Sequence, residues 1–128
     1  GIDTAFAGAL ALNGPNLDVL GLLPTAGNVS AIRACHNVHT LIAQIDPPKW
    51  PRTAAALPVE FDADGTALHG PDGLGGVNFP SSDRHSQHPA DKVLAELVHE
   101  HPREVTVICL GPSTTVARAF DRDPELPA

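Results

Sequence analysis

The sequence has few basic residues, and this scarcity limits the partners that the protein can have. Its 128 residues include 8 Lys or Arg against 15 Asp or Glu, a formal net charge of -7 at pH 7. A chain of this charge repels phosphate backbones, and no cluster of basic residues offsets the repulsion. We therefore expect no nucleic-acid partner.

Cysteine and long apolar runs are also scarce. The two cysteines, Cys35 and Cys109, form no C-x-x-C pair, which favours free thiols in a reducing compartment, one on an apolar helix face and one in a buried strand. No apolar run approaches the ~20 residues that span a bilayer, and no basic segment precedes a cleavable apolar stretch. These absences predict a soluble, cytoplasmic protein without a membrane partner.

The sequence does have enough apolar residues for one core. Hydrophobic residues make up 42% of the chain, and 128 residues fit a single domain, 1–128. Amphipathic or Ala/Leu-rich patterns predict helices over residues 4–12, 31–45, 90–98 and 113–122. Apolar, β-branched runs predict strands over residues 18–24, 53–57 and 104–110.

The alternation of these elements predicts the fold class. Strands that alternate with helices over short loops favour an α/β protein with a parallel, Rossmann-like, three-layer sheet that carries helices on both faces. Residues 58–88 have weak periodicity and many Gly, Pro, Asp and Ser residues, which predicts an irregular excursion. Ligands of such sheets bind where strands lead into helices, which selects residues 1–4, 25–28 and 110–115.

Four segments resemble the motifs of the inosine-uridine-preferring nucleoside hydrolase family. Residues 1–5 (GIDTA) resemble the second half of its D-x-D-P-G-x-D-D-A motif, and residues 20–28 (LGLLPTAGN) resemble its T-x-A-G-N turn. Residues 69–76 (HGPDGLGG) are similar to its H-G-x-D-G-L-G segment, and residues 108–126 begin with ICLGPSTT and end with RDPEL, similar to its A-L-G-P-L-T-N and D-P-E signature. The four segments occur in the same order as the motifs of the family, but they correspond only to the first half of a family member.

The resemblance implies hydrolysis of the N-glycosidic bond of purine or pyrimidine ribonucleosides, with a calcium ion that binds the ribose hydroxyls and activates water. Calcium takes about six to eight oxygen ligands, and metal-bound water is deprotonated more easily. Cleavage would pass through an oxocarbenium-like state that nearby carboxylates stabilise. The fold implied is the α/β sheet above, incomplete relative to a full family member.

The resemblance also assigns roles to residues. Asp3 and Asn28 match residues that contact ribose, and His69 matches a histidine near the base. Leu110 falls where a backbone carbonyl would bind calcium, whereas Thr4 replaces an expected calcium-binding Asp. Two further Asp residues of the motif, one of them the general base, would precede Gly1, so we expect a segment before Gly1. The family's distal His-Asp pair has no counterpart, and no catalytic residue is assigned.

Each of these residues also has a simpler interpretation. Asp3 suits the first turn of a helix, where the helix dipole favours acidic residues, and Asn28 suits the N-cap of the following helix. The glycines of residues 69–76 suit tight turns. His36 and His39 lie three residues apart, but a zinc site needs three or four converging ligands, so we do not expect one.

Three functions follow as hypotheses. The first is a nucleoside N-ribohydrolase, which we expect to be inactive as these 128 residues alone. The second is a non-catalytic domain that binds ribose or a nucleoside through Asp3 and Asn28 without a competent metal site. The third is a truncated product whose unpaired strand edges promote association, which makes a homo-oligomer a possible state.

Overall fold

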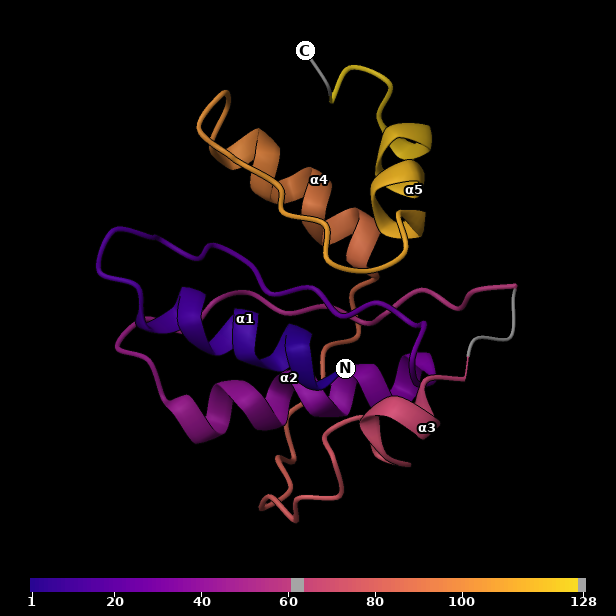
Figure 1. Ribbon diagram of the computed structural model, residues 1–128. Coiled ribbons are helices and arrows are strands. Elements are labelled where there is room, and N and C mark those ends of the chain that lie inside the picture. Colours follow the sequence, from indigo (N-terminus) through magenta and orange to yellow (C-terminus); the bar gives the residue numbers. More distant parts are fainter. Residues whose placement is uncertain (61–63, 127–128) are drawn as a thin grey trace.

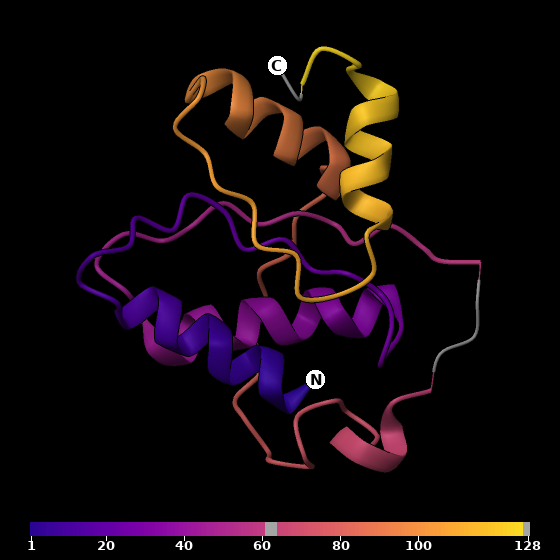
Figure 2. The same ribbon diagram turned by 45° about the horizontal axis from the view of Figure 1, so that its top comes forward.

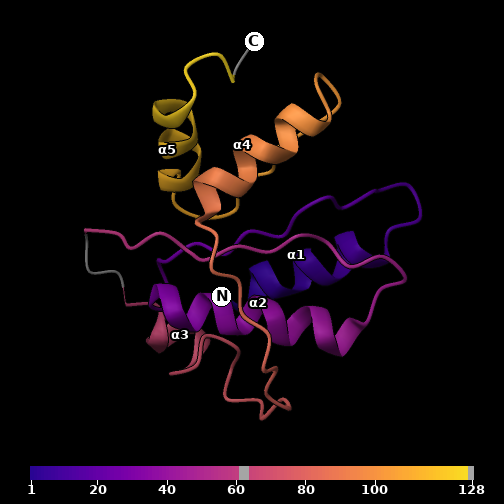
Figure 3. The same ribbon diagram turned by 180° about the vertical axis from the view of Figure 1, so that it is seen from behind.

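The helices lie on two sides of a layer of irregular chain. A computed structural model describes residues 1–60 and 64–126 and, within them, places the helices α1 (Ile2–Asn13), α2 (Ala31–Ile45), α3 (Thr66–His69), α4 (Ala90–Glu100) and α5 (Thr114–Arg122). Helices α1 and α2 lie on one side of the irregular segments, and helices α4 and α5 lie on the other side (Figure 1). A tilted view and a view from behind show the same arrangement (Figures 2 and 3).

The expected sheet is reduced to two isolated bridges. Among the described residues, Gly21 pairs with Arg52 and Ala55 pairs with Pro89, both in the parallel direction. Leu22 N–H donates to the Arg52 carbonyl at 2.9 Å, and Arg52 N–H donates to the Leu20 carbonyl at 3.0 Å. The parallel direction expected for residues 18–24 and 53–57 is therefore found, but the strands themselves and the Rossmann-like sheet are not confirmed.

The strand expected at residues 104–110 was wrong. Within the described residues this segment forms no bridge, and Ile108 is 73% exposed. Cys109 is exposed as well, so the expectation of a buried thiol there was also wrong. A β-branched run gains its strand structure from cross-strand pairing and packing, and no other described segment forms backbone hydrogen bonds with residues 105–110.

The four longer helices were predicted correctly, within a few residues at each end. The short helix α3 was not expected, since it lies within the excursion of residues 58–88. The N-cap of α2 is Ser30, whose Oγ accepts a hydrogen bond from Arg33 N–H at 3.3 Å. Asn28 is therefore not the capping residue, and that interpretation of it was wrong.

Helix α2 is buried on a wider face than its apolar stripe predicted. The sequence predicts a buried stripe of Ala31, Ala34, Val38, Leu41 and Ile45. The buried residues also include His39 and Ile42, which lie outside this stripe. His39 Nδ1 lies 2.8 Å from the Cys35 carbonyl, and His39 Nε2 lies 2.9 Å from Thr53 Oγ1. The Cys35 thiol in turn accepts a hydrogen bond from Ala56 N–H at 3.0 Å. These polar contacts hold α2 against residues 53–56. The His39 ring therefore has a structural role between the two segments.

Helix α4 supplies most of the core on the other side. A buried cluster joins Ala54 to Ala90, Val93 and Leu97 of α4, and Leu20 and Leu23 pack against it. The amphipathic pattern predicted for residues 90–98 is therefore confirmed. Among the described residues, no helix combines the length and the apolar character that crossing a membrane requires.

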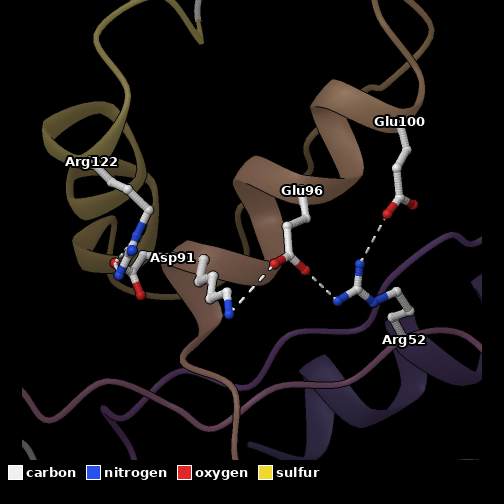
Figure 4. Close-up of polar contacts among 6 residues, drawn as sticks. Arg52, Asp91, Glu96, Glu100 and Arg122 are labelled. Carbon is white, nitrogen blue, oxygen red and sulfur yellow. Dashed lines mark hydrogen bonds and ion pairs between the residues drawn. The ribbon is translucent and has the colours of Figure 1, made fainter.

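Two groups of ion pairs hold α4 in place (Figure 4). Arg52 Nη2 lies 2.7 Å from Glu96 Oε2, and Arg52 Nη1 lies 3.6 Å from Glu100 Oε1. The hydrogen bond from Arg52, the largest cause, holds the pKa of Glu96 below its usual value. On the opposite side of α4, Arg122 pairs with Asp91 and thereby ties α5 to the first turn of α4.

Candidate functional site

Three side chains predicted from separate loops meet at Gly1. A Cβ atom added to Gly1 would lie 2.8 Å from each of three atoms, Asp3 Oδ1, Asn28 Nδ2 and His69 Nε2. A side chain at position 1 would therefore make these three polar groups shift, which shows how closely they gather around Gly1. We call Asp3, Asn28 and His69 the Gly1 cluster. The sequence expectation that Asp3 and Asn28 share one site agrees with this geometry.

Hydrogen bonding assigns a proton to His69. Its Nδ1 accepts a hydrogen bond from Ile2 N–H at 3.3 Å, so the neutral ring carries its proton on Nε2. That Nε2 lies 3.9 Å from Asp3 Oδ1. The His69 side chain is only 17% exposed, whereas that of Asp3 is 79% exposed. The imidazole is thus held in place, and the carboxylate faces solvent.

The Gly1 cluster offers both kinds of hydrogen-bonding group. His69 Nε2–H and the Asn28 amide NH₂ donate, and the Asp3 carboxylate accepts. A sugar hydroxyl donates one hydrogen bond and accepts others, so it complements such a set. The cluster is chemically suited to a ligand with neighbouring hydroxyl groups.

Local structure explains how each member of the cluster is positioned. Asp3 lies in the first turn of α1, as its simpler interpretation predicted. Asn28 follows the Gly21 bridge and precedes the Ser30 cap, and its carbonyl accepts a hydrogen bond from Gly65 N–H at 3.0 Å. A Cβ at Gly65 would lie 2.6 Å from Asn28 Cβ, so glycine allows this close approach. His69 is the last residue of α3, which begins directly after Gly65.

The glycines after His69 shape a tight loop, as the simpler interpretation of residues 69–76 predicted. Gly70, Gly73, Gly75 and Gly76 all have φ between 75° and 79°, a left-handed conformation that glycine adopts without strain. Asp72 Oδ1 accepts hydrogen bonds from Leu74 N–H and Gly76 N–H, both at 3.0 Å. These backbone hydrogen bonds hold the pKa of Asp72 below its usual value. The loop stays close to His69, because Gly75 N–H donates to the His69 carbonyl at 2.7 Å.

The predicted loop at residues 110–115 lies beside the predicted loop at residues 25–28. A Cβ at Gly27 would lie 3.4 Å from two ring carbons of Pro112, and one at Gly111 would collide with Thr25 Oγ1. The turn after Leu110 therefore packs against residues 25–27. Leu110 itself is exposed, and no hydrogen bond among the described residues joins it to the Gly1 cluster. Thr4 is exposed on α1. The expected part of Leu110 and Thr4 in binding calcium therefore stays a prediction.

A cleft of about 300 Å³ adjoins the cluster at Asn28. Its polar lining includes Ser30, Arg33, Asp64 and Thr66. None of these four was predicted from the sequence. Asp64-Gly65-Thr66 is the one local signal that was available, since Asp followed by Gly favours a turn, and here Asp64 Oδ1 accepts a hydrogen bond from Thr66 N–H at 2.9 Å.

The acidic residues are too dispersed for a metal centre of several side chains. Across residues 1–60 and 64–126, no three His, Cys, Asp or Glu side chains converge closely enough to hold a metal ion. At Gly1 a single carboxylate oxygen faces an amide nitrogen and a ring nitrogen that donate hydrogen bonds. Calcium prefers about six to eight oxygen ligands. The side chains gathered at Gly1 therefore do not fit a calcium ion.

Comparison with known proteins assigns the class. The family model described as inosine-uridine preferring nucleoside hydrolase matches residues 1–128. The chain belongs to this family. It is 37% identical over 128 residues to uridine nucleosidase 1 of Arabidopsis thaliana, covering 96% of this chain and 38% of that protein.

Solved structures agree with the family assignment. A plant nucleoside hydrolase shares 34% sequence identity and superimposes with a TM-score of 0.86, over 98% of this chain and 41% of that one. A purine-preferring ribonucleoside hydrolase from Gardnerella vaginalis superimposes with a TM-score of 0.89 at 24% identity, over 98% of this chain and 42% of that one, which shows the shared fold. The chain thus spans about two fifths of the length of the relatives it matches. Those relatives have α/β folds, so the α/β class holds for this chain.

Proposed function

We propose that this chain binds the ribose of purine or pyrimidine ribonucleosides, as part of a nucleoside N-ribohydrolase. The observation that carries the proposal is the meeting of Asp3, Asn28 and His69 at Gly1. Two donors and one carboxylate within a few ångströms complement the adjacent 2′ and 3′ hydroxyls of ribose. Family membership supports the same ligand class.

The hydrolytic step needs more than the Gly1 cluster supplies. Cleavage of an N-glycosidic bond requires an activated water, and the family resemblance implies that calcium supplies the activation. The donors at Gly1 do not fit calcium, and His69 Nε2 carries a proton and cannot accept one from water. We therefore expect these 128 residues to bind ribose without releasing a base from uridine or inosine.

A titration with ribose tests the proposal. Binding of ribose to the 128-residue chain is measured by calorimetry and by shifts of amide resonances, and the same titration uses 2-deoxyribose. We expect ribose to bind and to shift the resonances of residues 1–3, 28 and 69. Deoxyribose lacks one of the two hydroxyls, so it should bind about tenfold more weakly, on the scale of one charge-assisted hydrogen bond.

Matched variants make the test specific. Asp3→Asn removes the one charge of the Gly1 cluster, whereas Asp121→Asn removes an exposed charge on α5. We expect the first variant to lose ribose binding and the second to keep it. Ribose binding that Asp3→Asn leaves unchanged, or no ribose binding by a folded chain, would refute the proposal.

The second candidate function is a non-catalytic binding domain, and the donor set at Gly1 favours it. Such a domain would bind ribose or a nucleoside equally with and without calcium. A titration with added calcium, followed by chelation, separates the two candidates. Calcium-dependent binding together with release of free base supports the hydrolase, and calcium-independent binding without release supports the binding domain.

We further propose a cytoplasmic location. The support is chemical, since Cys35 and Cys109 are both free thiols, which persist in a reducing compartment. The net charge of -7 supports a small-molecule ligand in place of a nucleic acid. Self-association is a separate proposal, and residues 105–110 carry it, as argued below.

A further inference from the structure

Helix α2 contacts the glycine loop of residues 70–76 through one amide side chain. Asn37 Nδ2 donates a hydrogen bond to the Asp72 carbonyl at 2.8 Å, across 35 positions of the sequence. A Cβ added to Gly73 would lie 3.3 Å from the same amide nitrogen and 2.7 Å from Val29 Cγ1, so the loop lies directly against α2 and the residues before it. The half-buried Asn37 therefore fixes where the loop lies on α2.

The carboxylate of Asp72 stiffens the loop that Asn37 holds. Its Oδ1 accepts hydrogen bonds from Leu74 N–H and Gly76 N–H. These hydrogen bonds lower the pKa of Asp72, and after them the charge of Arg33, one helical turn before Asn37, contributes to the same shift. The carbonyl of Asp72 is thus bound to α2, and its carboxylate orders the residues that follow.

The same loop holds His69 in the Gly1 cluster. Gly75 N–H donates to the His69 carbonyl at 2.7 Å. A Cβ added to Gly75 would lie 3.2 Å from Ile2 Cδ1, so the loop also packs against the residue whose N–H donates to His69 Nδ1 at 3.3 Å. The loop therefore supports both partners of the hydrogen bond that orients the imidazole.

We propose that Asn37 is a positioning residue of the Gly1 cluster, which acts through the loop of residues 70–76 on the His69 ring. A binding group keeps one orientation when its neighbours lock it by packing and hydrogen bonds. With the loop held, Nε2–H of His69 stays near Asp3 Oδ1. The inference rests on the proposed binding of ribose for the effect on affinity, whereas the orientation of the His69 ring is a property of the chain alone.

Spectroscopy tests the orientation of the His69 ring without a ligand. The ¹⁵N resonance of His69 Nδ1 and the δ1 methyl resonance of Ile2 are recorded at about pH 8, where histidine rings are neutral. We expect both to move in Asn37→Ala, because a loosened loop lets water replace Ile2 N–H as the partner of Nδ1. Asn13→Ala is the matched control, since Asn13 Nδ2 donates to the Ala9 carbonyl at the same 2.8 Å at the other end of α1. It should leave both resonances in place.

Ribose affinity tests whether Asn37 acts through His69. His69→Ala removes the ring and should weaken ribose binding about fivefold, as the loss of one uncharged hydrogen bond predicts. Asn37→Ala should weaken it by up to the same factor, and Asn13→Ala should not. In the double variant of Asn37 and His69 we expect no loss beyond that of His69→Ala, because the two residues act on one contact. Losses that add in the double variant would overturn the inference.

A second substitution separates positioning from a loss of folding. Asn37→Asp keeps the shape of the side chain but replaces the amide donor by a carboxylate oxygen, so it should repeat the effects of Asn37→Ala. Circular dichroism shows whether each variant folds. Unmoved His69 and Ile2 resonances in a folded variant overturn the inference. Failure of both variants to fold overturns it as well, since Asn37 would then serve the whole fold.

The two measurements also separate this inference from the proposed function. Resonances of His69 and Ile2 that move in Asn37→Ala, in a chain that binds no ribose, support the positioning of the ring and refute the ribose proposal. Resonances that stay in place, together with ribose binding that Asn37→Ala leaves unchanged, refute the role of Asn37 and leave the ribose proposal intact.

Discussion

Arg122 Nη2 lies 2.9 Å from Asp91 Oδ2, and this pair is the charged contact between α5 and the first turn of α4. The Asp91 side chain is 10% exposed, and its other oxygen, Oδ1, is buried with no hydrogen-bond partner among the described residues. The carboxylate thus depends on Arg122 for compensation of its charge (Figure 4).

Removal of Arg122 should therefore destabilise the chain. Arg122→Gln leaves a mostly buried carboxylate without its cation, and we expect a loss of about 2 kcal/mol in the free energy of unfolding, below the usual cost for a fully buried pair because Arg122 is half-exposed. Urea denaturation followed by circular dichroism measures the loss. Arg118→Gln on the same helix, whose side chain is exposed, is the matched control and should change the stability little.

Gly65 tests how closely α3 must approach Asn28. An alanine Cβ there would lie 2.6 Å from Asn28 Cβ, so Gly65→Ala must displace Asn28. We expect at least a tenfold loss of ribose affinity, or about 1.4 kcal/mol. In Gly27→Ala the new Cβ meets only Pro112, at an ordinary contact distance of 3.4 Å, and ribose affinity should be kept. Equal affinities of the two variants would show that Asn28 does not contact ribose.

The helices and the members of the Gly1 cluster could be predicted from the sequence, for separate reasons. The helices could be predicted because apolar residues recur at helical spacing, as they do in α4. Asp3, Asn28 and His69 were found because motif resemblance carries information on distant contacts that composition lacks. By contrast, Arg33 and Asp64 belong to no motif, and only the folded chain brings them to one cleft.

The strands could not be predicted, because a strand depends on its neighbours. Residues 104–110 have the composition of a buried strand, yet Ile108 is exposed since no described segment pairs with it. Residues 18–24 pair at Gly21 alone. The buried His39 illustrates the same limit, since its partners Cys35 and Thr53 became visible only with the chain folded.

The pKa of Asp72 predicts how stability changes with pH. Its folded-state pKa lies below that of the unfolded chain, so the stabilising contribution is present above about pH 4 and is lost as the pH falls through the folded value. We expect the urea midpoint of the unaltered chain to fall as the pH is lowered below about 4. Asp72→Asn should reduce this dependence, and Asp121→Asn should preserve it. A dependence unchanged in Asp72→Asn would contradict the assignment.

The two thiols should react at different rates. Cys109 is exposed, whereas Cys35 is partly buried and its Sγ accepts a hydrogen bond from Ala56 N–H. A disulfide reagent such as Ellman's reagent should label one thiol rapidly and the second only as the chain unfolds. Cys109→Ser should abolish the rapid phase, and Cys35→Ser should retain it. A rapid phase that persists in Cys109→Ser would show that α2 separates readily from residues 54–56.

Residues 105–110 should make the chain associate with itself. Their backbone N–H groups have no backbone partner among the described residues, and Ile108 is 73% exposed within a β-branched run. An unpaired apolar segment of this kind pairs readily with another copy. Sedimentation velocity should therefore show oligomers that increase with concentration, and Ile108→Lys should reduce them by charge repulsion. The matched control is Ile32→Lys, because Ile32 is 85% exposed but lies on the helix α2 and not in an extended segment. If both variants reduce association equally, general surface hydrophobicity and not the free backbone of residues 105–110 drives it.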